Sequence, residues 1–300
     1  MYLCSKCFYP YFGFFSIKWK LKSFLSFVFQ IYFWSLGVYV LLLILGKVNF
    51  SNSEFFQRMN CLIGNWWFVE AYLGLYLLAP VLNAFLEKSN RRTILLFVIL
   101  FVFFESYSQL LGSTRNFDRG YNTIAFCGLY VIGRLLFFYQ EELQVLRKKI
   151  SYVFLLSYFF VAIIISCLAL YKLVVKGHDF FSIQRSFVLS YSNPLVIIEA
   201  IFLFLIFHSI NFSNKWVNYV ASSIFAVYLL HMHPNIREWY YSYCGQLYNY
   251  SFLHHLIVLI GLFVGIVFLS VFFDKIRLLL FTWLYTTCET SISKKWNTIK

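Results

Sequence analysis

Long apolar runs separated by short polar stretches dominate the chain. A helix that crosses a bilayer needs about 20 mostly apolar residues. Because unpaired backbone groups cannot face lipid, such runs predict helices. The pattern therefore predicts an all-α, polytopic membrane helical bundle with about eight transmembrane helices, of which the two short ones at 194–210 and 216–231 could instead be re-entrant. The eight segments are Phe24–Leu45, Trp66–Leu86, Thr93–Leu111, Tyr121–Tyr139, Ser151–Tyr171, Pro194–Ile210, Trp216–His231 and Leu256–Phe273.

The composition excludes most other classes of protein. Of the 300 residues, 61% are hydrophobic, 23% aromatic and only 12% charged, whereas a soluble domain carries roughly 25% charged residues. A soluble enzyme, a coiled coil, a disordered chain and a disulfide-rich secreted module are therefore excluded. No repeat, linker or soluble domain interrupts the apolar pattern, so we expect one integral membrane domain over residues 1–300.

The basic residues predict the orientation. With the start of the first span in the cytoplasm, the inner loops hold 15 Lys and Arg residues and the outer loops hold 8. This bias follows the positive-inside rule and predicts a multi-pass protein of the inner (plasma) membrane with both termini cytoplasmic. The net charge of +13 is explained in the same way. We expect no nucleic-acid partner, because the chain has no nucleic-acid-binding motif.

The first 17 residues fit this pattern poorly. The apolar stretch Phe8–Ile17 is too short to span, contains Pro10 and Gly13, and lacks the features of a signal peptide. Cys4 and Cys7 form a C-x-x-C pair, but no further ligands follow at the spacing of a zinc site. We therefore expect no metal.

Ionisable side chains inside the expected spans are the first candidates for function. Such groups are costly in lipid and face a protein interior or a wet cavity, although each could also sit at a membrane surface. The six candidates are Glu70, Glu105, Arg134, Glu199, His208 and His231.

Three short motifs carry most of the expected chemistry. Glu70 follows Trp66 and Trp67 in a stretch that continues through Tyr72 to Asn83, where the aromatic rings fit either a binding surface or an interfacial belt. Near a helix end, His231 can act as an acid, a base or a donor, and Arg237 can hold a phosphate or carboxylate. His233 lies between them, and the alternative is an interfacial histidine beside a loop arginine.

The third motif is basic. Lys18, Lys20 and Lys22 alternate just before the first span. They serve as an orientation signal, and they would also suit an acidic cytoplasmic substrate such as the phosphates of coenzyme A or of a lipid headgroup.

Two of these motifs resemble a known family. Trp66–Asn83 resembles the W-F-x-x-x-Y-x-x-L-Y-L-L-x-P-x-L-N pattern of the acyltransferase 3 family, especially of its bacterial glycan O-acetyltransferases. Ala226–Arg237 resembles the later G-x-Y-L-x-H-x-x-P-x-x-R motif of that family, with Ala226 in place of the usual glycine. Lys18–Lys22 resembles the basic entry to one of its early helices.

The resemblance implies a membrane O-acyltransferase with about ten helices in the complete family pattern. It would transfer acetyl from acetyl-CoA to a cell-surface polysaccharide or a lipid-linked glycan. By this reading His231, Glu70 and Arg237 are catalytic, and Lys18, Lys20 and Lys22 bind acetyl-CoA. Its partners are membrane lipid and the glycan acceptor, whose binding we assign to four residues: Trp66, Trp67, Tyr72 and Asn83.

The resemblance also implies an early helix with a catalytic histidine that precedes the motifs found here. We therefore expect residues 1–17 to be the remnant of a truncated helix and the 300-residue chain to have little activity alone. Three alternatives remain: a glycan or lipid transporter or flippase, a polysaccharide polymerase, and a catalytically inactive truncated homologue. A transporter would favour internal repeats, and a polymerase a large outer loop, neither of which the sequence displays.

Overall fold

The structure is a computed structural model that describes residues 13–111, 117–150, 152–177, 187–210, 213–246 and 251–299. Every regular element in these ranges is a helix, which confirms the all-α prediction. The C-x-x-C pair and residues 1–12 of the expected helix remnant lie outside them.

The long apolar helices confirm a polytopic bundle, in which the described residues hold six or seven candidate spans where the sequence predicts about eight. In the described parts of the chain, six helical segments are long and apolar enough to cross a membrane. A seventh is added if α6 (Thr123–Phe138) and α7 (Gln140–Lys149), which meet at a bend of 65°, form one span. The six are α2 (Leu21–Ile44), α4 (Trp67–Lys88), α5 (Arg91–Leu110), α8 (Val153–Val174), the segment Phe187–His208 that ends with α10 (Pro194–His208), and Leu253–Thr290 within α14 (Phe252–Ile299).

The segment expected to span at Trp216–His231 is instead broken. It forms α11 (Lys215–Ala221) and α12 (Ile224–His231), separated by Ser222 and Ser223. The Ser222 hydroxyl donates to the Tyr219 carbonyl at 2.8 Å. A serine that bonds to the carbonyls of its own turn competes with helix propagation, so the helix ends there and a new one starts.

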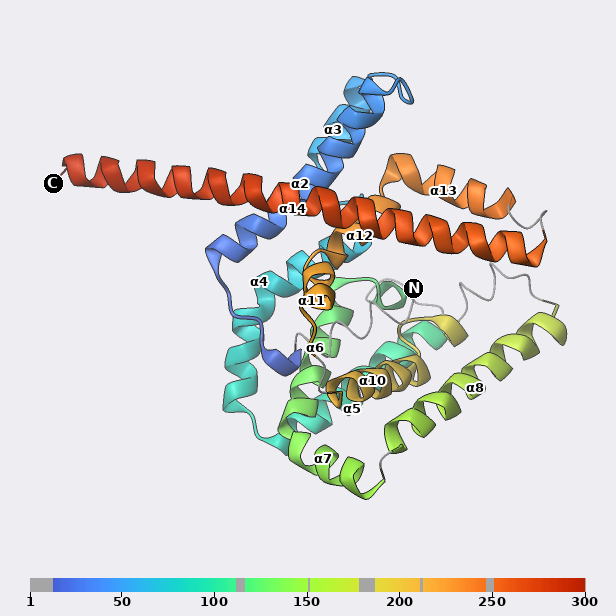
Figure 1. The fold of residues 1–300 in the computed structure, drawn as a ribbon. Coiled ribbons are helices and arrows are strands. Elements are labelled where there is room, and N and C mark those ends of the chain that lie inside the picture. Colours follow the sequence, from blue (N-terminus) through green and yellow to red (C-terminus); the bar gives the residue numbers. More distant parts are fainter. Residues whose placement is uncertain are drawn as a thin grey trace. The chain divides into compact units, whose positions relative to one another are not determined.

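The last span is longer than expected. Instead of ending near Phe273, α14 continues without a break for 48 residues (Figure 1). The loop expected to hold Lys275 and Arg277 is therefore helix, and Arg277 is only 3% exposed.

The chain divides into two compact units, each built from two separate stretches of sequence. The first comprises residues 1–19 and 67–212, and the second comprises residues 20–66 and 213–300. In the first, α4 and α5 pack on α6, and α8 packs on α10. In the second, α2 packs on α3 (Asn52–Met59), α12 and α14, and α13 (Pro234–Gln246) packs on α12.

Asparagine side chains begin four of these helices. Asn90, Asn122, Asn193 and Asn214 each accept a hydrogen bond from a backbone N–H of the first turn of α5, α6, α10 and α11. An asparagine cap satisfies a donor that would otherwise be unpaired.

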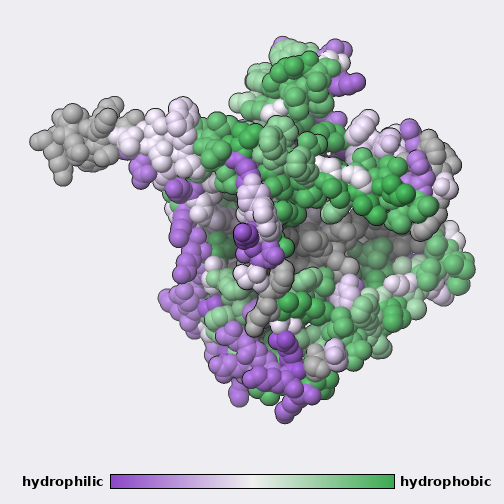
Figure 2. All heavy atoms as spheres, in the orientation of Figure 1, coloured by the Kyte–Doolittle hydropathy of each residue, from purple (hydrophilic) through white to green (hydrophobic). Residues whose placement is uncertain are grey.

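Charge is concentrated on α7 in the first unit. Its first turn holds Glu141 and Glu142 and its last turn Arg147, Lys148 and Lys149, an order that complements the helix dipole. Figure 2 shows hydrophilic residues gathered where Figure 1 labels α7, while apolar side chains cover much of α8.

Candidate functional site

His231 lies on the wall of a large apolar cavity in the second unit. The cavity has a volume of about 850 Å³ and is lined by α2, α12, α13 and α14. Apart from His231, Tyr240 and the indoles of Trp34 and Trp239, its lining is hydrocarbon and glycine. A cavity of this size is typical of a small-molecule site, where a few polar groups fix the ligand's orientation.

A backbone hydrogen bond fixes the proton of His231. Nδ1 lies 2.6 Å from the carbonyl oxygen of Val227, one turn earlier in α12. A carbonyl can only accept, so Nδ1 carries the hydrogen and Nε2 of the neutral ring carries the lone pair. His231 is 8% exposed and outside the six spans, and burial lowers its pKa. The ring is therefore a neutral base at pH 7.

A buried donor lies close to the same cavity. Trp34 of α2 is 3% exposed, and its indole N–H has no hydrogen-bond partner in the structure. A buried N–H without a partner costs free energy. The Trp34 ring lines the cavity, but its buried Nε1 does not reach the cavity surface.

Three glycines widen the cavity. A Cβ atom built on Gly37, Gly261 or Gly265 would meet no atom within 4 Å. Gly261 and Gly265 are four residues apart, so they lie on one face of α14. The space over them is therefore part of the cavity rather than a site of close helix packing.

His233, two residues on, has a structural role. It is fully buried, its Nδ1 accepts from the backbone N–H of Asn235 at 3.2 Å, and its Nε2 lies 3.1 Å from the Ser35 carbonyl. Nε2 must therefore carry the hydrogen. Burial lowers the pKa of His233 to about 4, so the ring is neutral and caps α13, which begins at Pro234.

A buried arginine lies in the same unit. Arg58 of α3 is 4% exposed, and its Nε and Nη1 have no hydrogen-bond partner in the structure. Burial lowers its pKa, and the charge of Glu54 opposes that shift. The Glu54 carboxylate also accepts a hydrogen bond from the Asn235 amide, which connects α3 to the start of α13.

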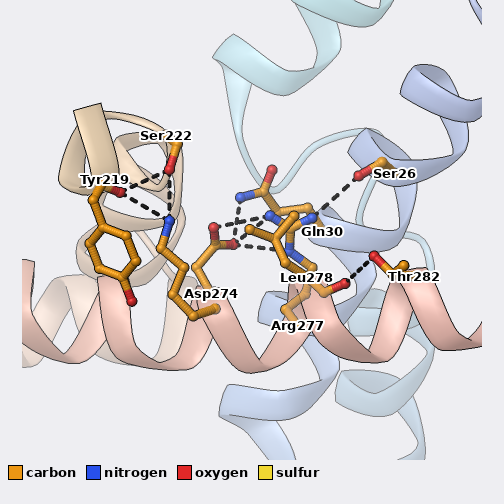
Figure 3. A network of polar contacts seen from close by, with 9 residues as sticks. Ser26, Gln30, Tyr219, Ser222, Asp274, Arg277, Leu278 and Thr282 are labelled. Carbon is orange, nitrogen blue, oxygen red and sulfur yellow. Dashed lines mark hydrogen bonds and ion pairs between the residues drawn. The ribbon is translucent and has the colours of Figure 1, made fainter. Parts of the chain in front are cut away.

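A buried ion pair holds two walls of the cavity together (Figure 3). Asp274 of α14 is fully buried, and the Arg277 guanidinium donates to both of its carboxylate oxygens at 2.8–3.0 Å. On α2, Gln30 donates to Asp274 at 2.8 Å, and Ser26 accepts from Arg277 at 3.3 Å. The charges are thus paired, and the pair fixes α14 against α2.

The neighbouring Lys275 stabilises the break between α11 and α12. Its ammonium donates to the Tyr219 carbonyl at 3.0 Å and to the Ser222 hydroxyl at 2.7 Å (Figure 3). A cation at a helix C-terminus satisfies the last carbonyls and interacts favourably with the dipole. The break that places His231 at the end of a short helix is therefore supported from α14.

Comparison with protein families identifies the chain. The model of the acyltransferase 3 family, described as an acyltransferase domain, matches residues 2–275. The chain belongs to the acyltransferase 3 family. Comparisons with curated proteins and with solved structures found no match. The match runs through both compact units, and it makes this protein a membrane acyltransferase.

The other predicted site residues of the acyltransferase do not line the His231 cavity. Arg237 is half-buried on α13 and is not among the described residues that line the His231 cavity. Trp66 is 2% exposed and packs edge-to-face on His233, with ring centroids 5.9 Å apart. Trp66 thus contacts the capping histidine and has no part in an interfacial belt.

Glu70, Trp67 and Tyr72 belong to α4 of the first unit. Glu70 is exposed in the first turn, where a carboxylate complements the helix dipole. Trp67 is half-buried and lies edge-on to Tyr121, at 4.7 Å between ring centroids. Tyr72 lies parallel to Phe68, at 6.2 Å.

Asn83 takes part in a closed set of hydrogen bonds. Its amide donates to the Ile17 carbonyl at 2.9 Å and accepts from the Tyr130 hydroxyl at 2.6 Å, while the Ile17 N–H donates to that hydroxyl at 2.9 Å. Nearby, a Cβ on Gly13 would lie 1.9 Å from the Tyr130 carbonyl oxygen. Asn83 and Tyr130 therefore anchor the segment that precedes α2.

The remaining predicted residues are dispersed. Lys18, Lys20 and Lys22 are exposed, and Lys22 lies over the Tyr285 ring. The Arg134 guanidinium lies over the rings of Phe137 and Phe138.

The two glutamates predicted inside later spans are both buried. Glu105 accepts from the Ser192 hydroxyl at 2.8 Å, which ties α5 to the turn before α10. Among the described residues, no group of three or more His, Cys, Asp or Glu side chains could hold a metal.

Sequence reasoning missed the partners that make the site. Trp34, Gln30 and Asp274 lie on or beside the expected spans, and nothing in the period of either helix marks them as buried partners. Arg58 carries a local signal, because Glu54 precedes it by four residues, the spacing of an ion pair on a helix.

We expect the buried ion pair to dominate the stability of the second unit. Asp274→Asn leaves the Arg277 charge buried without its counterion, which costs about 3–5 kcal/mol. Thermal unfolding of the purified protein in detergent measures the loss.

The matched control is the exposed pair Arg91–Glu142, which has the same 2.8 Å separation with side chains 52% and 54% exposed. Glu142→Gln should cost only about 0–1 kcal/mol. Equal effects of the two substitutions would contradict the assignment of Asp274–Arg277 as the pair that holds α14.

Proposed function

We propose that this acyltransferase transfers an acetyl group from acetyl-CoA to a hydroxyl of a cell-surface polysaccharide or lipid-linked glycan. The family supports acyl transfer, and one observation supports the O-transfer chemistry. It is the bond from His231 Nδ1 to the Val227 carbonyl, which leaves a basic Nε2 on a ring at the wall of the cavity.

His231 moves one proton in this mechanism. Nε2 takes the proton of the acceptor hydroxyl as its oxygen bonds to the acetyl carbonyl carbon. The Val227 carbonyl stabilises the resulting imidazolium through Nδ1–H. The C–S bond of the thioester then breaks, and Nε2 returns the proton to the departing thiolate.

The lining of the cavity favours the lipid-linked acceptor over a free polysaccharide. A sugar needs several polar partners, because a buried hydroxyl without one is costly. This cavity offers few polar groups and a long hydrocarbon surface. An acceptor with a hydrocarbon chain would place the chain over the glycines of α14 and its hydroxyl at His231.

The other assigned roles stay part of the proposal. Lys18, Lys20 and Lys22 attract the phosphates of acetyl-CoA, Glu70 serves acceptor binding or proton transfer, and Arg237 stabilises charge. Trp67 and Tyr72 bind the acceptor. The protein is a multi-pass protein of the inner membrane with both termini in the cytoplasm.

Replacing His231 tests the base. His231→Gln should lower acetyl transfer roughly 100-fold or more, the usual contribution of a general base, measured as labelled acetyl incorporated into membrane glycan from acetyl-CoA.

Because the pKa of His231 is lowered, wild-type activity should stay constant down to about pH 6.5, the unperturbed value, and fall only below it.

The control is His254→Gln on the exposed side of α14, away from the lining of the cavity. It should leave transfer unchanged. Full activity in His231→Gln would remove His231 from the mechanism.

Filling the cavity tests the acceptor. In Gly261→Leu and Gly265→Leu the new Cβ meets no protein atom within 4 Å and the side chain extends into the cavity, so both variants should keep the wild-type melting temperature yet lose most transfer to lipid-linked glycan. Gly245→Leu, at an equally open position on α13 outside the lining, should be silent. Normal transfer in Gly261→Leu would show that no acceptor chain occupies the cavity.

Labelling of single cysteines tests the orientation. In a cysteine-free background, a membrane-impermeant maleimide added to intact cells should label Lys176→Cys and should not label Lys295→Cys. Permeabilised cells, in which both should react, provide the control. Labelling of Lys295→Cys in intact cells would place the C-terminus outside and contradict the predicted orientation.

A further inference from the structure

A second cavity, of about 510 Å³, lies in the first unit, where α7 meets α6, α8 and the end of α10. None of the side chains proposed for acetyl transfer lines it. Its polar lining comes from α7 and the end of α10: Gln140, Gln144, Arg147, Lys148, His208 and Ser209. Of these, Gln144, Arg147 and Lys148 are partly open to solvent at the rim of the cavity.

This polar lining is suited to an anion. Each of the six side chains can donate a hydrogen bond, two are permanent cations, and no Asp or Glu is among the described lining residues. Of the two carboxylates in the first turn of α7, Glu142 is bound by Arg91 at 2.8 Å. The positive charge of the last turn is therefore not neutralised at the cavity.

The rest of the lining is apolar. Phe14, Leu136, Leu143, Phe154 and Leu205 contribute hydrocarbon surface beside the basic groups. The His208 ring is held between two of the unit's phenylalanines: its centroid lies 4.6 Å from that of Phe14, and it stacks on Phe204 at 5.6 Å. Arg147 is close enough for its charge to act on His208.

We propose that this cavity binds a phosphate ester. Its phosphate contacts Arg147, Lys148 and His208, and its organic part lies on the apolar floor. A guanidinium fork matches the oxygens of a phosphate, and basic pockets between helices at a membrane face bind phosphorylated head groups. The volume and the apolar floor exceed what an inorganic anion would use.

Phosphate esters can reach such a cavity from two sources. One is a soluble nucleotide such as the coenzyme A portion of the acyl donor, and this source rests on the function proposed above. The other is a membrane phospholipid with a phosphate headgroup. The two share the chemistry that the cavity recognises, and separate binding measurements distinguish them.

Comparison with Lys149 distinguishes a phosphate-binding site from a signal that only orients the chain in the membrane. Lys149 shares the last turn of α7 with Arg147 and Lys148 but does not line the cavity. If Arg147, Lys148 and Lys149 serve only to orient the chain in the membrane, replacing any of them should have the same effect on probe binding. If the cavity binds phosphate, replacing Arg147 and Lys148, which line it, should weaken probe binding more than replacing Lys149.

The experiment measures binding to the full chain in phosphatidylcholine nanodiscs, with two radiolabelled probes, desulfo-coenzyme A and dioctanoyl phosphatidic acid. The cavity variant is Arg147→Gln/Lys148→Gln. The charge-matched control is Arg92→Gln/Lys149→Gln, which changes two exposed cations outside the lining. A third variant, Lys18→Gln/Lys20→Gln/Lys22→Gln, tests the other basic cluster.

We expect the cavity variant to lose roughly tenfold or more in affinity for at least one probe, since each lost charge-assisted hydrogen bond is worth a tenfold change or more. The control should stay within about twofold, because its two charges lie outside the lining and charges that do not contact the ligand are largely screened. Loss for desulfo-coenzyme A identifies the soluble source, and loss for phosphatidic acid identifies the lipid. Equal affinity of the cavity variant and the control, or loss only in the Lys18/Lys20/Lys22 variant, overturns the proposal.

A second measurement is independent of acetyl transfer. In a cysteine-free background, Gln144→Cys places a thiol in the cavity lining, and the bound probe should slow its reaction with a methanethiosulfonate reagent. Glu141→Cys, exposed on α7 outside the lining, should react at the same rate with and without the probe. If a saturating probe leaves the reaction rate of Gln144→Cys unchanged, the proposal is also overturned.

Discussion

The second unit depends on keeping one buried carboxylate paired. Asp274 is fully buried, in the middle of a very apolar helix, where an isolated charge would be prohibitively costly. Arg277 neutralises it from the next turn, and Gln30 completes its hydrogen bonds from α2. Because the Gln30 amide belongs to another helix, the cost of burying the Asp274 carboxylate is offset only when α2 packs on α14 in the register that brings Gln30 to Asp274. The cavity at His231 has its two long walls on these helices, so its shape follows from the pairing.

The two histidines of the H-x-H sequence divide two tasks. Both rings are buried and neutral, but their protons are on opposite nitrogens: Nδ1 in His231 and Nε2 in His233. The difference comes from the backbone around each ring. His231 ends a helix and finds a carbonyl one turn behind it, whereas His233 precedes a helix and finds an amide N–H ahead of it. The break between α12 and α13 is therefore enough to give the two histidines opposite tautomers: His233 caps α13, and His231 keeps Nε2 as its basic nitrogen.

Sequence reasoning located the helices well and their partners poorly. Apolar length alone predicts α2, α4, α5, α8 and α14, since a lipid-facing helix must be apolar over its whole length. At Trp216–His231 it predicted one span or a re-entrant segment, and the structure has two short helices, because the average hydropathy hides two serines and a lysine that acts from another helix. It found His231 through a family motif, but Trp34 and Asp274 carry no local pattern, because their burial depends on contacts over long separations in the chain. Asn83 fitted a binding motif, yet its amide is engaged by Ile17 and Tyr130.

The bond between His231 and Val227 has a consequence for how this protein can change over evolution. In many enzymes a carboxylate side chain orients the histidine, so a single substitution abolishes the arrangement. Here the acceptor is a main-chain carbonyl, which every amino acid supplies. Position 227 can therefore vary freely in size and polarity without loss of the tautomer. What selection must preserve instead is the place where α12 ends, and a one-residue insertion or deletion between 227 and 231 would do more harm than any substitution at 227.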